Sequence, residues 1–246
     1  KRPQSPGMLS FVIKLDGVSS KLASRFKSGD RLSVMGPTGA KLPLPSTGVM
    51  IIVGAEWARC QILSIGYELK RRGVRLIYFS CGFETFLDEE IHSLCQEVVA
   101  LQSESDVIEA VQTWSGENAD LISLAEQCQV FSSPLLLKAI QAARGNGALD
   151  RLNHVRFTAA VFGPMQCMLK GVCVQCLQWQ IDPTTGKRTK AVYACSWQNQ
   201  PIEIIDIDNM TERLAQNQCQ EQMGRLWLEH ISSGKVQKNN SDSFAW

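Results

Sequence analysis

Two short apolar runs, Gly48-Val-Met-Ile-Ile-Val-Gly54 and Val74-Arg-Leu-Ile-Tyr-Phe79, decide the fold of this chain. A continuous apolar run such as residues 49–53 is typical of a parallel strand that is buried on both faces. Between the two runs, residues 58–72 carry apolar side chains at helical spacing, and Lys70-Arg-Arg ends this segment, where cations suit the helix dipole. The sequence therefore predicts a strand–helix–strand unit and an α/β fold with a parallel sheet.

The rest of the chain is assigned by the same patterns. Strands are predicted near both ends of this unit, at residues 9–15, 31–35, 157–162, 177–181 and 190–194. Helices are predicted at residues 86–95, 104–114, 120–128, 134–144 and 211–231. Residues 232–243 are rich in Ser, Asn and Lys, a composition that predicts disorder.

Composition restricts the class of partner. The 246 residues include 25 basic and 24 acidic side chains, so the net charge is +1, which argues against nucleic acid or an anionic membrane surface as the main partner. No apolar run reaches the roughly 18 residues that a membrane-spanning helix needs. The start, Lys1-Arg-Pro-Gln-Ser-Pro, has no apolar stretch of the signal-peptide type and predicts a segment of a longer polypeptide.

Four cysteines stand in the pattern C-x5-C-x2-C-x18-C, formed by Cys167, Cys173, Cys176 and Cys195. Two cysteines separated by two residues can turn both sulfurs toward one point, and the other two can complete a tetrahedral sulfur cage. Plant-type [2Fe–2S] ferredoxins use the related spacing C-x4-C-x2-C…C, whereas zinc ribbons use two C-x2-C pairs. One close pair with a flanking cysteine favours a [2Fe–2S] cluster, with zinc and unliganded thiols as the alternatives.

The remaining cysteines indicate the redox compartment. Cys60, Cys81, Cys95 and Cys128 each lie alone in apolar or helical surroundings, where a cysteine behaves as a small hydrophobe. The total of nine is odd, and the spacing suggests no disulfide framework. We therefore expect a reducing, cytoplasmic environment.

Three landmarks follow one another along the chain: Gly29-Asp-Arg-Leu-Ser-Val-Met-Gly-Pro-Thr-Gly39, the strand–helix–strand unit, and Gly163-Pro-Met joined to the cysteines and ending in Tyr193-Ala-Cys195. This order resembles the ferredoxin–NADP⁺ reductase superfamily. Within it, the chain is similar to the iron–sulfur branch, which contains the electron-transfer subunit of dihydroorotate dehydrogenase and the small subunit of NAD(P)H:ferredoxin transhydrogenase. The resemblance covers about residues 10–208.

The resemblance implies four parts. Residues 1–47 would be the end of a flavin-binding β-barrel, 48–165 a nucleotide-binding α/β domain, 166–210 a [2Fe–2S] segment, and 211–246 a terminal helix and tail. FAD and NAD(P)H would contact residues that match the family's loops: Gly36, Pro37, Gly54, Arg59, Gly163 and Pro164. The implied function is an electron-transfer module that passes electrons between nicotinamide nucleotide or flavin and a partner domain or subunit of a larger oxidoreductase.

The nucleotide loop departs from the family's glycine-rich pattern. It reads Gly54-Ala-Glu-Trp-Ala-Arg-Cys-Gln61, so Gly54 is its one glycine, and Glu56 places a negative charge where phosphates would dock. Arg59 would offset this charge in part. The sequence leaves open a second interpretation: a reductase-type fold that has lost its nucleotide and uses a structural zinc site with four cysteine ligands as a docking module. Neither a Ser-His-Asp arrangement nor paired carboxylates are visible, so we expect no hydrolytic activity.

Overall fold

The computed structural model describes residues 9, 11–13, 15, 18–34, 42–82, 86–160, 174, 176–216 and 218–233. It divides into two compact units. The smaller unit combines Lys1–Val34 with Ala215–Trp246, and the larger unit is Met35–Leu214. Within these described ranges, no helix is both long enough and apolar enough to cross a bilayer.

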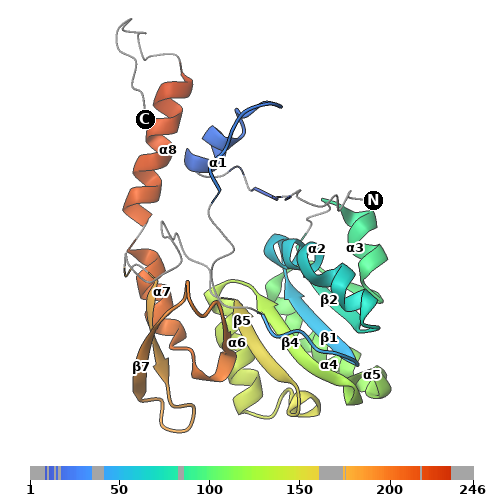
Figure 1. Ribbon diagram of the computed structural model, residues 1–246. Coiled ribbons are helices and arrows are strands. Elements are labelled where there is room, and N and C mark those ends of the chain that lie inside the picture. The colour runs from blue at the N-terminus through green and yellow to red at the C-terminus, as the bar shows by residue number, and fades with distance from the viewer. Residues whose placement is uncertain are drawn as a thin grey trace, which may run out of the picture. The chain divides into compact units, whose positions relative to one another are not determined.

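The larger unit is built on a six-stranded sheet with the order β3-β2-β1-β4-β5-β8 (Figure 1). Five strands run parallel, and the short β8 pairs antiparallel with β5 at the edge. The strands are β1 (Val49–Gly54), β2 (Arg75–Cys81), β3 (Glu97–Leu101), β4 (Ala125–Phe131), β5 (Arg156–Ala160) and β8 (Asn199–Pro201). The predicted α/β fold with a mostly parallel sheet is confirmed.

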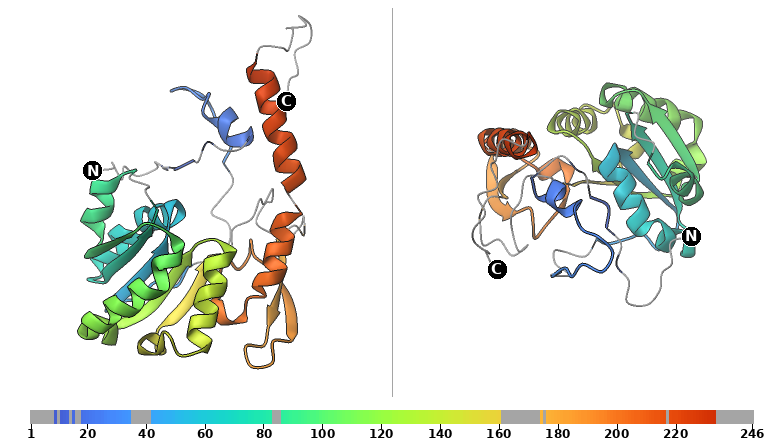
Figure 2. Two further views of the ribbon diagram at one scale, coloured as in Figure 1. Left: turned by 180° about the vertical axis from the view of Figure 1, so that it is seen from behind. Right: turned by 90° about the horizontal axis from the view of Figure 1, so that it is seen from above.

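Helices cover both faces of this sheet (Figures 1 and 2). One face carries α2 (Glu56–Arg71) and α3 (Asp88–Leu94). The other carries α4 (Val107–Glu117), α5 (Ala119–Ser123) and α6 (Pro134–Gly145). Three short 3₁₀ helices lie at Glu104–Asp106, Asp150–Leu152 and Ile202–Ile204. Because the connections after β1 and β2 use one face and those after β3 and β4 use the other, β1 and β4 form the point at which the winding of the sheet reverses.

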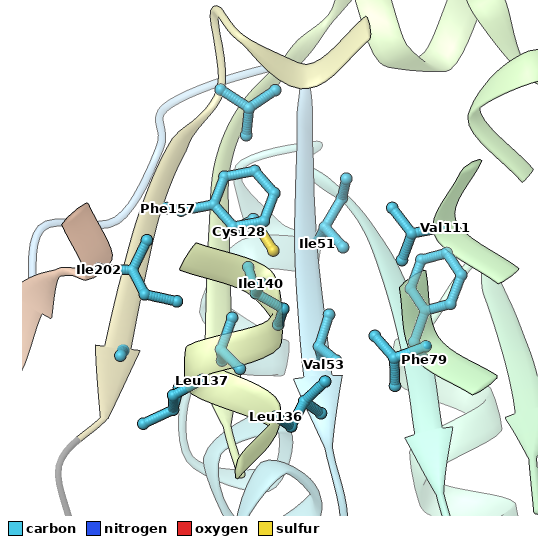
Figure 3. Close-up of a cluster of buried hydrophobic side chains, with 14 of the residues drawn as sticks. Ile51, Val53, Phe79, Val111, Cys128, Leu136, Leu137, Ile140, Phe157 and Ile202 are labelled. Carbon is cyan, nitrogen blue, oxygen red and sulfur yellow. The ribbon is translucent and has the colours of Figure 1, made fainter. Parts of the chain in front are cut away.

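The apolar run of β1 contributes side chains to the hydrophobic cores on both faces of the sheet. Met50 and Ile52 pack toward α2, whereas Ile51 and Val53 point toward the helices on the opposite face, where Figure 3 shows them beside Phe79. This alternation follows from the pleat of a strand, which directs successive side chains to opposite faces. All residues of the run are buried, and each such aliphatic side chain contributes about 1.5–3 kcal/mol of hydrophobic stabilisation.

The prediction of a helix at residues 120–128 is wrong for most of these residues. Helix α5 ends at Ser123, and Ala125–Phe131 forms β4 between β1 and β5. The polar side chains of Gln127 and Gln129 conceal this strand in the sequence, because buried parallel strands are usually apolar. Strand β3 was not predicted either, whereas the strands at 49–53 and 74–79 and the helices at 58–72 and 134–144 are confirmed within a few residues.

The smaller unit differs from the prediction. None of its described residues lies in a strand, so the strands predicted at 9–15 and 31–35 are wrong for these residues. Instead, helix α1 (Val18–Ala23) packs on helix α8 (Gln218–Ser232), where a Cβ added to Gly224 would lie 3.2 Å from Cγ2 of Val18. The single helix predicted at 211–231 is two, α7 (Ile207–Ala215) and α8. The assignment of residues 1–47 to a flavin barrel stays a prediction.

A patch of buried polar groups lies on β4 and β5. Gln129 is paired in register with Thr158, and Gln127 lies one pleat further along the same face. In the described part of the chain, Nε2 of Gln127, Oε1 of Gln129 and Oγ1 of Thr158 are buried without a hydrogen-bond partner. A buried polar atom in this state costs roughly 1–3 kcal/mol.

We therefore expect Thr158→Val to raise the free energy of unfolding by about 1 kcal/mol, because valine keeps the shape of threonine and removes the unpaired hydroxyl. Urea denaturation followed by circular dichroism measures this change. A loss of stability of similar size would instead show that the Thr158 hydroxyl is bonded to a water or a ligand.

Candidate functional site

A β-hairpin lies between β5 and β8 in the chain and includes two of the predicted metal ligands at its end. Strands β6 (Leu177–Ile181) and β7 (Arg188–Tyr193) pair antiparallel, so the strands predicted at 177–181 and 190–194 are confirmed apart from small shifts at their ends. The turn between them is held by Asp182, whose Oδ1 accepts hydrogen bonds from the backbone N–H groups of Thr184 (2.8 Å) and Thr185 (3.0 Å). These bonds hold the pKa of the Asp182 carboxyl below its usual range. We call residues 176–195 the cysteine hairpin.

Cys176 and Cys195 lie at the open end of the cysteine hairpin, opposite the turn. Cys176 immediately precedes β6, and the backbone N–H of Ala194, next to Cys195, donates to the carbonyl oxygen of Cys176 over 3.1 Å. Both residues are buried, with 6% of Cys176 and 0% of Cys195 exposed. Sequence positions far apart are thus brought to one buried place, as a shared metal site requires.

The other two predicted ligands, Cys167 and Cys173, lie outside the described residues, as do Gly36, Pro37, Gly163 and Pro164. Among the residues that are described, no group of three His, Cys, Asp or Glu side chains forms a metal site, and this part includes only two of the four cysteines. The chemistry of the donors that are visible, two buried thiols at one end of a hairpin, fits half of a four-thiolate site. The complete ligand set stays a prediction.

Val174, two residues before Cys176, has an unusual backbone conformation. Its φ angle is 60°, in the left-handed region that a β-branched residue rarely adopts. The carbonyl oxygen of Val174 accepts a hydrogen bond from the backbone N–H of Leu177 (3.1 Å). Such a backbone conformation costs about 1–2 kcal/mol, and strain of this kind gathers where surrounding contacts hold a functional loop.

Buried amides attach the cysteine hairpin to the sheet. Gln180 donates from Nε2 to Oε1 of Gln200 on β8 over 2.9 Å, and Gln200 donates in turn to Oε1 of Gln178 over 3.5 Å. All three side chains are buried. Because β8 pairs with β5, these bonds fix the two cysteines relative to the edge of the α/β domain.

The reversal point of the sheet, where nucleotides bind in related folds, is tightly closed. Gly54 ends β1 with φ at +145°, and a Cβ at this position would lie 2.1 Å from the carbonyl oxygen of Phe131, at the end of β4. The hydroxyl of Tyr78 donates to the carbonyl oxygen of Gly54 over 3.0 Å, and burial raises the pKa of Tyr78 to about 12. Gly54 is therefore required by the close approach of two strands, whether or not a ligand is bound.

Carboxylates occupy the helix starts at this point. Glu104 accepts hydrogen bonds from the backbone N–H of Ser133 (3.1 Å) and from its hydroxyl, at the N-terminus of α6. Glu56 lies in the first turn of α2. Helix N-termini attract anions, so a protein carboxylate bonded there competes with a phosphate for the same donors. Sequence reasoning identified Glu56 but missed Glu104, since no local pattern links it to Ser133.

Arg59, which was predicted to contact the cofactor, has a buried side chain that links α2 to the start of α3. Only 2% of its side chain is exposed. Its Nη2 donates to the carbonyl oxygen of Phe86 (2.9 Å) and to Oδ1 of Asp88 (2.7 Å), and the guanidinium lies 5.3 Å from the centre of the Phe86 ring. These contacts direct the charge toward the start of α3 and account for its burial without a ligand. Cofactor binding by Arg59 stays an untested prediction.

This arrangement predicts a pH dependence. The bond from Arg59 holds the pKa of the Asp88 carboxyl below its usual range, so the ion pair stabilises the fold above the unfolded-state pKa of about 3.9 and is lost as the pH falls through the folded-state value. We expect Asp88→Asn to lower the melting temperature at pH 7 and to melt like the wild type at low pH. A difference in melting temperature that is the same at every pH would contradict the role given to this ion pair.

Comparison with known proteins supports the fold. No family model matches the chain. An uncharacterized protein of Rickettsia prowazekii (strain Madrid E) is 29% identical over 220 residues, which are 88% of this chain and 24% of that protein. The chain thus spans about a quarter of the length of this relative.

One solved structure has a fold similar to that of this chain. It is the NADH-dependent reduced ferredoxin-NADP oxidoreductase, described for flavin-based electron bifurcation, and it superposes with a TM-score of 0.67 and 20% identity. The match covers 88% of this chain and 75% of the other. At this level of identity the likeness shows the fold alone, and it agrees with the predicted α/β architecture with a mostly parallel sheet.

Proposed function

We propose that the chain is an electron-transfer domain of a larger oxidoreductase, in which Cys167, Cys173, Cys176 and Cys195 hold a [2Fe–2S] cluster. The observation that carries this proposal is the placement of buried Cys176 and Cys195 at one end of the cysteine hairpin. The similarity in fold to an oxidoreductase that is named for ferredoxin supports it. When bound, such a cluster accepts and releases single electrons.

The residues of this chain would do three things for the cluster. The cysteine thiolates would bind iron, the surrounding apolar side chains would exclude water, and the amides of Gln178, Gln180 and Gln200 would hold the site at the sheet edge. The described residues of 9–34 contain no strand, so we propose that FAD is held mainly by a partner domain or subunit. That partner would exchange electrons with the cluster.

The experiment that tests this function is a reductive titration with dithionite in the absence of oxygen. We expect the chain to take up about one electron, with bleaching of its visible absorption, because a [2Fe–2S] cluster is a one-electron carrier. Uptake of no electrons by a protein that retains its metal would sink the proposal.

The carboxylates at the reversal point favour a second candidate, a reductase-type fold without a nucleotide. Glu104 on Ser133 and Glu56 on α2 both disfavour a pyrophosphate. In this case the four cysteines would form a structural zinc site, and the domain would dock onto other parts of the oxidoreductase. Colour separates the two candidates, because a [2Fe–2S] protein is brown and a zinc site is colourless.

Both candidates share one prediction about nicotinamide nucleotides. We expect NADH and NADPH to bind no tighter than about 1 mM, because Glu104 already accepts from Ser133 at the start of α6 and Glu56 places a negative charge in the first turn of α2. Isothermal titration calorimetry measures this affinity. A micromolar dissociation constant would overturn the interpretation of the reversal point as closed.

A further inference from the structure

Helix α7 is fastened to the cysteine hairpin at its N-terminal end. Asp206 caps this helix by accepting from the backbone N–H of Asn209 (2.9 Å), and its other carboxylate oxygen accepts from Nε of Arg188 on β7 (2.8 Å). The backbone of Trp179 on β6 closes the contact, donating to Oδ1 of Asn209 and accepting from the N–H of Asp206, each over 3.1 Å. The side chains of Ile207 and Met210 are buried in the core. The helix is therefore a rigid neighbour of the hairpin.

The other end of α7 carries Arg213, which bonds to the backbone of Val174, two residues before Cys176. Its Nη2 donates to the carbonyl oxygen of Val174 over 3.1 Å. The same oxygen accepts from the backbone N–H of Leu177, and Val174 is the residue with the strained φ of 60°. A guanidinium held by a helix thus supports the backbone conformation that places Cys176.

The charge of Arg213 is permanent, since a guanidinium does not lose its proton in proteins. A cluster with four thiolate ligands is an anion, and reduction adds one more negative charge. A cation close to such a centre stabilises the reduced form more than the oxidised form, and nearby charge is one of the factors that set iron–sulfur potentials. The same cation would offset the negative charge of a zinc ion with four thiolates.

We propose that Arg213 is a positioning residue of the metal centre, which holds the backbone at Val174, two residues before Cys176, and raises the reduction potential of the cluster. This inference rests on the proposed function, because it concerns the same four cysteines. It adds a residue that lies 37 positions beyond Cys176 in the sequence and that no cysteine spacing identifies.

The test compares Arg213→Gln with Arg213→Lys and with Arg71→Gln, a matched change at an exposed arginine on α2, over the other half of the sheet. Circular dichroism first establishes that each variant is folded. The reduction potential is then measured by titration against redox dyes without oxygen. We expect Arg213→Gln to shift the reduction equilibrium about tenfold toward the oxidised form, equivalent to a potential lower by about 59 mV. Arg213→Lys keeps the positive charge and should have a potential close to that of the wild type. Arg71→Gln should leave the potential unchanged.

The outcomes separate this inference from the proposed function. An unchanged potential in a fully iron-loaded Arg213→Gln protein would overturn the inference and leave the function standing. A wild type that holds zinc and no iron would overturn the function. In that protein we expect Arg213→Gln to lose zinc to a chelator about tenfold faster than the wild type, and equal rates would overturn the inference. A wild type that holds neither metal would overturn both.

Discussion

Replacing Gly54 by alanine is expected to destabilise the larger unit by about 2–5 kcal/mol, the sum of left-handed backbone strain and overlap in a packed core. The backbone at Gly54 has φ at +145°, and the new Cβ would lie 2.1 Å from the carbonyl oxygen of Phe131. The atom that it meets belongs to the backbone of β4, so it cannot turn away as the end of a flexible side chain could. Urea denaturation measures the loss as a lower transition midpoint.

Gly73→Ala is the matched control for this change. Gly73 also has a positive φ, +75°, but nothing lies within 4 Å of the added Cβ. This variant keeps the conformational cost and lacks the overlap, so we expect it to lose only about 1–2 kcal/mol. Equal losses in the two variants would show that the close approach of β1 and β4 contributes nothing.

Replacing Cys195 by serine is expected to abolish iron retention. A serine hydroxyl is a poor ligand for an iron site that selects thiolates. Cys195 is also completely buried, so a ligand from the solvent cannot replace its thiolate. Iron analysis after purification without oxygen measures the loss. Cys195 itself belongs to the core on one face of the α/β sheet, but β1–β5 and their helices supply most of the buried residues on both faces, so the sheet should stay folded.

Cys128→Ser is the control that separates ligand loss from damage to a core. Cys128 is 1% exposed, and burial raises the pKa of its thiol, so it stays protonated and apolar on β4. We expect this variant to lose stability and to keep its iron. Cys219→Ser, at an exposed position on α8, should change neither property. Full iron occupancy in Cys195→Ser would remove Cys195 from the ligand set.

Local pattern was sufficient for the parts of the fold that obey one simple rule. The run at 49–53 is apolar because β1 is central and buried on both faces, and the helix after it carries apolar spacing that matches one face. Strand β4 is central as well, yet Gln127 and Gln129 interrupt its apolar character, and their burial depends on neighbours distant in sequence. Secondary-structure propensity depends on single segments of sequence, so it did not identify β4, a strand that is stabilised by its neighbouring strands.

The candidate site also has some features that the sequence predicted and others that only the structure shows. The strands between Cys176 and Cys195 were predicted because they have their own local signals, whereas the metal site inferred from the cysteine spacing stays a prediction. The roles of Glu104 and Arg213 come from contacts across 29 and 39 positions of sequence, and no spacing rule reports such pairs. Arg59 was placed near the nucleotide loop by sequence, and its contacts with Phe86 and Asp88 required the packing of α2 on α3.

The most direct test of the central claim is an absorption spectrum combined with iron, zinc and acid-labile sulfide analysis, on protein purified without oxygen. The account predicts about two irons and two sulfides per chain, with visible bands beyond about 400 nm, as a [2Fe–2S] cluster requires. A colourless protein with about one zinc per chain would contradict it and would make the four cysteines a structural site.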